Sequence, residues 1–257
     1  MTQLHYKSFG DGRPVIILHG LFGSGRNWQG IARAMAKSHH VITPDLRNHG
    51  NSPHVSSMSY RDMANDVMEL INNLKLSDPV ILGHSMGGKV AMTLALLEPT
   101  LPCGLVIVDI APVAYEHDFR QLVAAIKSLS LSSISSRTEA EAALKQKLSS
   151  EKLAAFIMQN LERNSNGYGW RINLEQIAQS LPEIGQFPSD LKDSHCRCPA
   201  LFIGGAESAY ISNRHNTAIF QHFPVAEIKM VKDAGHWTHV DKPREFLELV
   251  TGFIQRL

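Results

Sequence analysis

Short apolar segments alternate with helical segments along most of this chain. The apolar segments are rich in β-branched residues, end in turn or glycine signals, and lie at Val15–Leu18, His40–Thr43, Pro79–Leu82, Leu105–Val108, Ala200–Ile203 and Glu227–Val231. Segments with helical periodicity lie between them, at Trp28–Ala36, Tyr60–Leu74, Gly87–Leu97 and Thr217–Phe220. Strands that are apolar at every position are buried on both faces, so this alternation predicts a mostly parallel, doubly wound α/β sheet with helices on both sides. The residues before Val15 are expected to add an antiparallel edge hairpin through an Asp11-Gly12 turn.

The alternation stops between about Val113 and Phe187. Apolar residues from Phe119 to Ile126, and again from Leu153 to Leu161, have the spacing of one helix face. We therefore expect consecutive helices here, with no strand among them. The chain is large enough for one main core, which we assign to residues 1–112 and 188–257, with residues 113–187 inserted as a helical cap.

The charge balance excludes partners that bind by electrostatic attraction. The chain has 25 basic and 24 acidic residues, and its formal net charge is +1. We therefore expect no nucleic-acid partner and no attachment to an anionic membrane. No apolar run approaches the roughly 18 residues needed to span a bilayer. The first residues lack the pattern of a signal peptide, so we expect a cytoplasmic protein.

The three cysteines give no disulfide framework. Cys196 and Cys198 form one Cys-x-Cys pair beside His195, and Cys103 stands alone. Two thiols and one neighbouring histidine are a poor tetrahedral set for zinc. We expect reduced thiols, no bound metal and no cofactor.

The pentapeptide Gly83-His84-Ser85-Met86-Gly87 fits the motif Gly-x-Ser-x-Gly, and it stands between a predicted strand and a predicted helix. In that setting the serine takes a strained backbone conformation with φ > 0, which lifts its hydroxyl clear of the sheet. The residues two before and two after it crowd the turn, so both must be small, as Gly83 and Gly87 are. Ser85 is the predicted nucleophile, and a serine in an ordinary glycine-rich turn is the alternative.

A nucleophilic serine also needs two N–H donors for the oxyanion. One comes from the residue after the nucleophile, here Met86, where the helix begins. The other comes from an early loop after a strand, here His19-Gly20-Leu21-Phe22-Gly23. We assign it to Leu21, with Phe22 as the second choice. The alternative is that this is an ordinary loop, in which His19 only stabilises the turn.

His236 is the predicted general base. It follows the last predicted strand and precedes the closing helix, in Asp233-Ala-Gly-His-Trp-Thr-His239. A late histidine at the carboxyl end of a strand can reach the serine hydroxyl. His239 is the nearest rival, but we expect it to stabilise its loop, and we expect His84 to be a packing residue.

The sequence leaves two candidates for the acid that orients the base. Asp109 ends the predicted strand Leu105–Val108, 24 residues after Ser85. Glu207 follows the next core strand, in a position where many serine hydrolases of α/β type have aspartate. Either carboxylate could reach Nδ1 of His236, and spacing alone does not separate them.

Several motifs together resemble the bacterial YbfF-type esterases of the α/β-hydrolase fold. They are His19-Gly-Leu-Phe-Gly23, Asp45-Leu-Arg-Asn-His-Gly-Asn-Ser52, Gly83-His-Ser-Met-Gly-Gly-Lys89, Val108-Asp-Ile-Ala-Pro112, Trp170-Arg-Ile-Asn-Leu174 and Ala234-Gly-His-Trp237. The resemblance covers nearly the whole chain and implies that the acid follows the earlier strand, which favours Asp109. It also implies that a buried Asp–Arg pair braces the loop containing Asp45, Arg47 and His49.

The resemblance implies hydrolysis of small-molecule acyl esters, with acyl thioesters as a further substrate class. We expect a Ser85–His236–Asp109 triad that works through an acyl-enzyme, and cap helices that wall the acyl pocket. Phe22, Trp170 and Trp237 are the candidate substrate-binding residues. A carbon–carbon hydrolase or lyase with the same triad is the alternative, followed by a non-catalytic ligand-binding relative. The sequence predicts no oligomeric state.

Overall fold

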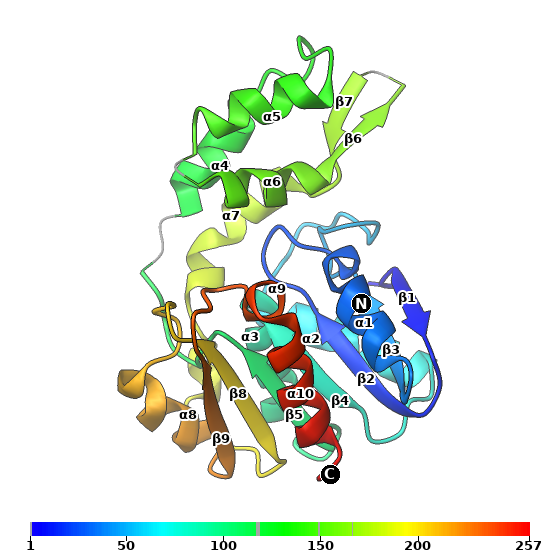
Figure 1. Cartoon of the computed structure of the whole chain (residues 1–257), viewed down its shortest axis with the longest axis vertical. Helices are drawn as coiled ribbons and strands as arrows, with labels where there is room; N and C mark the ends of the chain where they lie inside the picture. The colour runs from blue at the N-terminus through cyan, green and yellow to red at the C-terminus, as the bar shows by residue number, and fades with distance from the viewer. Residues whose placement is uncertain (1, 117–118, 149, 166) are drawn as a thin grey trace.

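The computed structural model describes residues 2–116, 119–148, 150–165 and 167–257. Seven of the described strands form one sheet in the order β1-β3-β2-β4-β5-β8-β9 (Figure 1). They are β1 (Tyr6–Phe9), β2 (Arg13–Leu18), β3 (His39–Pro44), β4 (Val80–His84), β5 (Gly104–Val108), β8 (Ala200–Gly205) and β9 (Ala226–Val231). Every pairing from β3 to β9 is parallel, and β4 and β5 are buried at all positions. The predicted mostly parallel sheet is confirmed.

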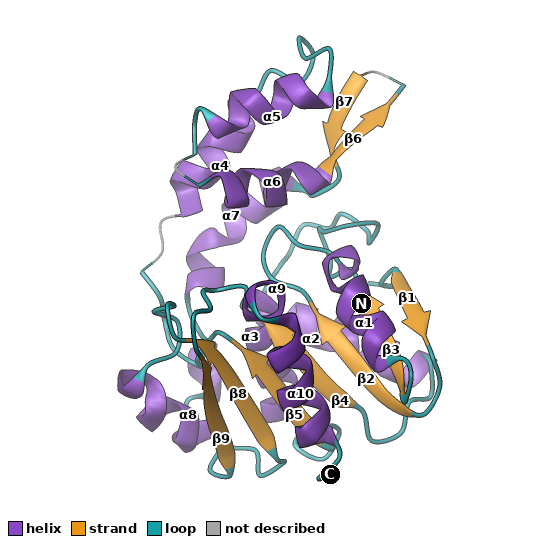
Figure 2. Cartoon of the chain, in the orientation of Figure 1, coloured by secondary structure: helices purple, strands orange, loops and turns teal. Residues whose placement is uncertain are grey.

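Helices cover both faces of this sheet. Val15 and Ile17 of β2 pack on the side of α1 (Gln29–Met35) and α10 (Pro243–Ile254). Ile16 and Leu18, which alternate with them, pack on the side of α2 (Tyr60–Asn73), α3 (Met86–Leu97) and α8 (Asn216–His222). Figure 2 shows α10 in front of the sheet and α3 behind it. Because both side-chain directions of a strand are buried, the strands are apolar throughout rather than alternating.

The predicted edge hairpin is wrong. β1 is an antiparallel edge strand, but it pairs with β3 and not with β2. Both edges of β2 are already occupied, by β3 and β4, so the free edge of β3 is where β1 adds. The turn between β1 and β2 passes close to the backbone just before β3. A Cβ on Gly10, which has φ +67°, would lie 2.3 Å from the carbonyl oxygen of Ala36, so only glycine fits there.

An insertion leaves the sheet between β5 and β8 and stands at its upper end in Figure 1. Its described elements are α4 (Phe119–Lys127), α5 (Arg137–Lys145), α6 (Glu151–Ile157), the 3-10 turn Met158–Asn160, β6 (Leu161–Asn164), β7 (Gly167–Trp170) and α7 (Leu174–Gly185). The hairpin of β6 and β7 departs from the expectation of helices alone. Its strands pair only with each other in the described part of the chain and carry no buried apolar run, so they leave no strand signal in the sequence.

The loop after β3 is held by a buried Asp–Arg pair, as expected, and its aspartate comes from α2. Arg47 makes two hydrogen bonds with Asp66 of α2, from Nε to Oδ2 at 2.7 Å and from Nη2 to Oδ1 at 2.8 Å. The carboxylate of Asp45 instead accepts the backbone N–H groups of Gly25 and Asn51, both at 2.8 Å. Arg47 therefore fixes the loop to a helix, and Asp45 fixes its turn.

Breaking this pair should destabilise the fold strongly. Arg47→Met leaves the carboxylate of Asp66 buried without its cation, so the free energy of unfolding should fall by about 3–5 kcal/mol. Urea unfolding of the single variant and of Arg47→Met/Asp66→Leu measures this. The double variant should recover part of the lost stability. An exposed ion pair contributes up to about 1 kcal/mol, so a loss no larger than this in the single variant would contradict a buried Arg47–Asp66 pair.

Candidate active site

Ser85 lies in the tight turn between β4 and α3. Its backbone has φ 52° and ψ −118°, a strained combination for a residue other than glycine. A Cβ on Gly83 would lie 2.2 Å from the carbonyl oxygen of Gly87, and one on Gly87 would lie 2.4 Å from that of Leu18. Only glycine fits at either position. The turn therefore presents the half-buried Ser85 at the amino end of α3 and beside the end of β2.

His236 and Asp109 form a hydrogen-bonded pair close to that serine. His236 follows β9, and its Nδ1 lies 2.7 Å from Oδ2 of Asp109, which follows β5 and is fully buried. Oδ1 of Asp109 accepts the N–H of Gly205 at 3.0 Å, and the hydroxyl of Ser208 donates to Oδ2. Glu207, the other candidate acid, has an exposed side chain. The structure thus brings Asp109, and not Glu207, to His236.

Aromatic side chains fix the plane of the His236 ring. Tyr210 stacks on it, with ring centroids 4.2 Å apart and an interplanar angle of 24°. The ring of His84 lies 4.6 Å away, and His84 Nε2 hydrogen-bonds the backbone carbonyl of His236 at 2.8 Å. Burial holds the pKa of His84 well below its usual value, so this ring is neutral and donates to that carbonyl. His84 therefore does more than pack: it holds the His236 backbone.

The loop after β2 carries the first of the two candidate oxyanion donors. Gly23 N–H donates to Gly20 O at 2.9 Å and closes a turn in which Phe22 has φ 61°. Phe22 N–H donates to Nε2 of His49 at 3.2 Å and is occupied. Among the described residues, no acceptor takes the N–H of Leu21 or of Met86. The two N–H groups assigned from the sequence are thus available to bind a ligand.

Two buried histidines hold that loop in place. His19 Nδ1 donates to Gly20 O at 2.8 Å, and its Nε2 accepts the N–H of Leu46 at 2.9 Å. His49 Nδ1 donates to Arg47 O at 3.0 Å while its Nε2 accepts from Phe22. Burial lowers the pKa of His19, and it lowers the pKa of His49 to about 3. Each ring is neutral and so can both donate and accept, which joins the loops after β2 and β3.

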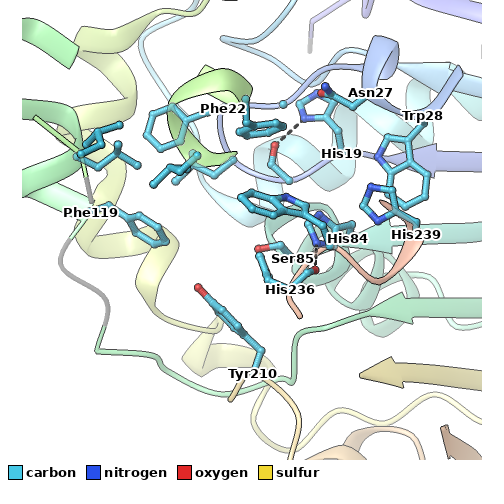
Figure 3. Close-up of a pocket in the computed structure, with 18 of the residues that line it drawn as sticks. His19, Phe22, Asn27, Trp28, His84, Ser85, Phe119, Tyr210, His236 and His239 are labelled. Atoms are coloured by element: carbon cyan, nitrogen blue, oxygen red, sulfur yellow. Dashed lines mark hydrogen bonds between the residues drawn. The ribbon is translucent and has the colours of Figure 1, made fainter. Parts of the chain in front are cut away.

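A cavity of about 460 Å³ opens over Ser85 and His236 (Figure 3). The core contributes Phe22, Trp28 and Trp237 to its walls, and the insertion contributes Phe119, Leu122, Lys147, Leu148, Leu153 and Phe156. Asn160 ties the insertion to the core by donating to the carbonyl of Phe22 at 2.8 Å. Trp170, predicted to bind substrate, is absent from the described residues that line this cavity. It lies on β7 opposite Leu161 and packs against the apolar cluster that contains Leu161.

Comparison with known proteins assigns the chain to a family. The model of the alpha/beta hydrolase fold family matches residues 13–243. The chain belongs to this family. It is 34% identical over 244 residues to esterase YbfF of Escherichia coli, covering 94% of this chain and 92% of that protein, and the resemblance inferred from the motifs is confirmed.

Two other relatives agree with this assignment. The sn-1-specific diacylglycerol lipase ABHD11 of Danio rerio is 40% identical over 254 residues, which are 96% of this chain and 80% of the lipase. The solved structure of a marine microorganism esterase is 35% identical and superposes with a TM-score of 0.94, covering 98% of this chain and all of that one. These relatives are carboxylic-ester hydrolases by name, and the chain is an enzyme of that class.

The sequence did not indicate three residues that shape this hydrolase site. Ser208 and Tyr210 follow β8 in the segment where Glu207 was the residue considered, and both contact the Asp109–His236 pair. Asn160 reaches Phe22 from the insertion. A hydroxyl or amide that bonds only in the folded chain leaves no pattern in the sequence. No three described His, Cys, Asp or Glu side chains converge as metal ligands would, and no described helix of the hydrolase is long and apolar enough to cross a bilayer.

The buried histidines should make this hydrolase sensitive to acid. Burial lowers the pKa of His239, which stacks on Trp28 at 4.0 Å, to about 3. Between pH 6.5 and 3 the unfolded chain binds a proton there that the native protein does not, so stability falls as the pH falls through this window. His239→Phe should reduce the slope of the free energy of unfolding by up to about 1.4 kcal/mol per pH unit.

Urea unfolding from pH 7.5 to pH 5 provides the measurement. His195→Gln is the control, because His195 is exposed and should leave the slope unchanged. Ester turnover of His239→Phe should stay within a few-fold of wild type. A loss as large as that expected on removing His236 would make His239 the base and overturn the assignment.

Proposed function

We propose that this chain is a serine esterase that hydrolyses small-molecule acyl esters through an acyl-enzyme intermediate. Ser85 is the nucleophile, His236 the general base, and Asp109 the acid that orients it. The observation that carries the proposal is the 2.7 Å contact between His236 and Asp109 beside a serine held at φ 52°. Two further observations support the proposal: Ser85 and His236 line the same cavity, and the buried Asp109 is hydrogen-bonded to His236.

In the first step the Ser85 oxygen attacks the ester carbonyl while Nε2 of His236 takes the hydroxyl proton. The N–H groups of Leu21 and Met86 stabilise the oxyanion, helped by the positive end of the α3 dipole. Asp109 keeps the proton of His236 on Nδ1 and stabilises the imidazolium. The bond to the leaving oxygen then breaks, and His236 passes its proton to that oxygen. Water adds to the acyl-enzyme by the same path and releases the acid.

The insertion acts as a cap over this chemistry. Its side chains, most of them apolar, form one wall of the 460 Å³ cavity, a volume within the usual range for small-molecule sites. Phe22 and Trp237 contribute core walls and are the substrate contacts we retain. Trp170 has no such role in this proposal, because it is absent from the described lining of the cavity and lies beside Leu161 on the neighbouring strand.

Acyl thioesters are a second substrate class that one observation favours. A further cavity of about 620 Å³ shares Asn27, Phe156, Trp237 and His239 with the first and leads toward Arg26 and Lys152. A long thiol carrier with phosphate groups would extend along it toward these cations, although Lys152 also pairs with Asp241. A carbon–carbon hydrolase would use the same triad, and the names of the relatives favour the ester.

Removing the nucleophile tests the proposal directly. Ser85→Ala should lower kcat for 4-nitrophenyl acetate by roughly 10⁶-fold, the effect of losing a serine nucleophile in a comparable enzyme. Its thermal unfolding should show a folded protein. Activity near the wild-type level, with contaminating esterase excluded by a second purification, would end the serine esterase proposal.

The two candidate acids make a matched pair of variants. Asp109→Asn keeps the shape of the side chain but lets His236 adopt the wrong tautomer, so kcat should fall by about 10⁴-fold, as in a serine protease. Glu207→Gln changes an exposed carboxylate and should keep kcat within twofold of wild type, since surface changes away from the site have small effects. Steady-state kinetics of both variants decides the assignment, and the reverse ranking would transfer the acid to Glu207.

A further inference from the structure

A second, much smaller cavity adjoins the large one at Ser85, and Leu21, Phe119 and Tyr210 line both. Its volume is about 30 Å³, and both candidate oxyanion residues, Leu21 and Met86, lie in its wall. The rest of the wall includes Tyr60, Ile110, Tyr115 and Ile184. His236, Trp237 and Phe156 line the large cavity and are absent from the described lining of the small one.

The chemistry of acyl transfer assigns a different substituent to each cavity. In the tetrahedral intermediate the reacting carbon carries the Ser85 oxygen, the oxyanion, the leaving group and the acyl chain. The oxyanion must face the N–H groups of Leu21 and Met86. The leaving atom must lie within hydrogen-bond reach of His236, which protonates it, so the leaving group extends into the large cavity. The acyl chain takes the remaining direction, away from His236 and into the small cavity.

The small cavity has room for very little. A cavity needs about 10–15 Å³ of space to hold one water molecule, so this one accepts roughly two groups of that size, one or two carbons, beyond the carbonyl. The wall is also fixed. At the end of α7, Ile184 O accepts the Tyr60 hydroxyl at 2.7 Å, and Gly185 O accepts the N–H of Tyr115 at 2.9 Å. A longer chain would have to break these contacts.

The only amine among the described residues of this wall is hydrogen-bonded to carbonyl oxygens, and burial lowers the pKa of this Lys89 amine to about 7. Lys89 Nζ donates to Gly185 O at 3.1 Å and to Gln186 O at 2.6 Å, and it lies over the rings of Tyr60 and Tyr115. The remaining walls are largely apolar. A largely apolar wall matches an uncharged acyl group.

We propose that the small cavity is the acyl subsite and restricts the enzyme to acyl groups of two or three carbons, while the large cavity takes the alcohol or thiol. This inference rests on the proposed serine esterase activity and specifies its substrates: short-chain, above all acetyl, esters of bulky alcohols or thiols. The insertion then has a divided role. Ile184 of α7 limits the acyl chain, and Leu153 of α6 contacts the leaving group.

A series of 4-nitrophenyl esters from acetate to octanoate tests the acyl side. Wild-type kcat/KM should fall roughly tenfold or more for each methylene that no longer fits, so hexanoate should be far poorer than acetate. Ile184→Ala should raise kcat/KM for butanoate relative to acetate by roughly tenfold. Ile184→Val should shift it in the same direction by less, and it gives the answer even if the alanine variant does not fold.

Leu153→Ala is the matched control, because Leu153 lines the large cavity and is absent from the described lining of the small one. It should leave the acyl-length profile unchanged and alter the ratio of kcat/KM for 1-naphthyl acetate to that for phenyl acetate. The Ile184 variants should leave this ratio unchanged. A wild-type enzyme that cleaves octanoate as well as acetate, or a shift in acyl length caused by Leu153→Ala, would overturn the subsite assignment and leave the esterase proposal intact. Esterase activity that survives Ser85→Ala would instead remove the proposed function itself.

Discussion

The close contact between the amino end of α3 and the carboxyl ends of β2 and β4 is the constraint on which this structure depends. It exists because residues 83 and 87 lack side chains, so a helix buried along nearly its whole length begins directly against the sheet. The strain at Ser85 is sustained by that burial, since relaxing the turn would pull α3 out of the apolar layer. The reactive hydroxyl and the helix dipole are thereby placed by packing of the core, and not by a flexible loop.

The parallel sheet then accounts for the remaining parts of the site. The carboxyl ends of β2, β4, β5, β8 and β9 face the same edge, so the turns that follow them deliver Leu21, Ser85, Asp109, Ser208 and His236 to one place. The buried neutral histidines bridge neighbouring turns because one ring can donate and accept at once. Burial that lowers their pKa is therefore also what lets them join the loops.

Much of the fold and of the site could be predicted from local sequence. The buried strands have an apolar run, and the turn at Ser85 has its own glycine spacing, so both are visible without tertiary information. Spacing alone did not separate Asp109 from Glu207, because both follow core strands. The resemblance to YbfF-type esterases favoured Asp109, and the packed sheet brings that residue to His236. The same limit applies to Trp170, which belongs to the insertion as expected but lies in the β6–β7 hairpin and not in the cavity wall. It applies also to β1, whose partner depends on which strand edge is free.

The position of β1 has a consequence for how this protein behaves in concentrated solution. An unpaired strand edge is a template for joining another chain, and an all-parallel sheet would expose β3 there. β1 covers that edge with only four residues and places Lys7 in its middle. The opposite edge, β9, carries Glu227 and Lys229 on exposed positions. Both borders of the sheet are therefore short or charged, which protects the sheet from edge-to-edge aggregation.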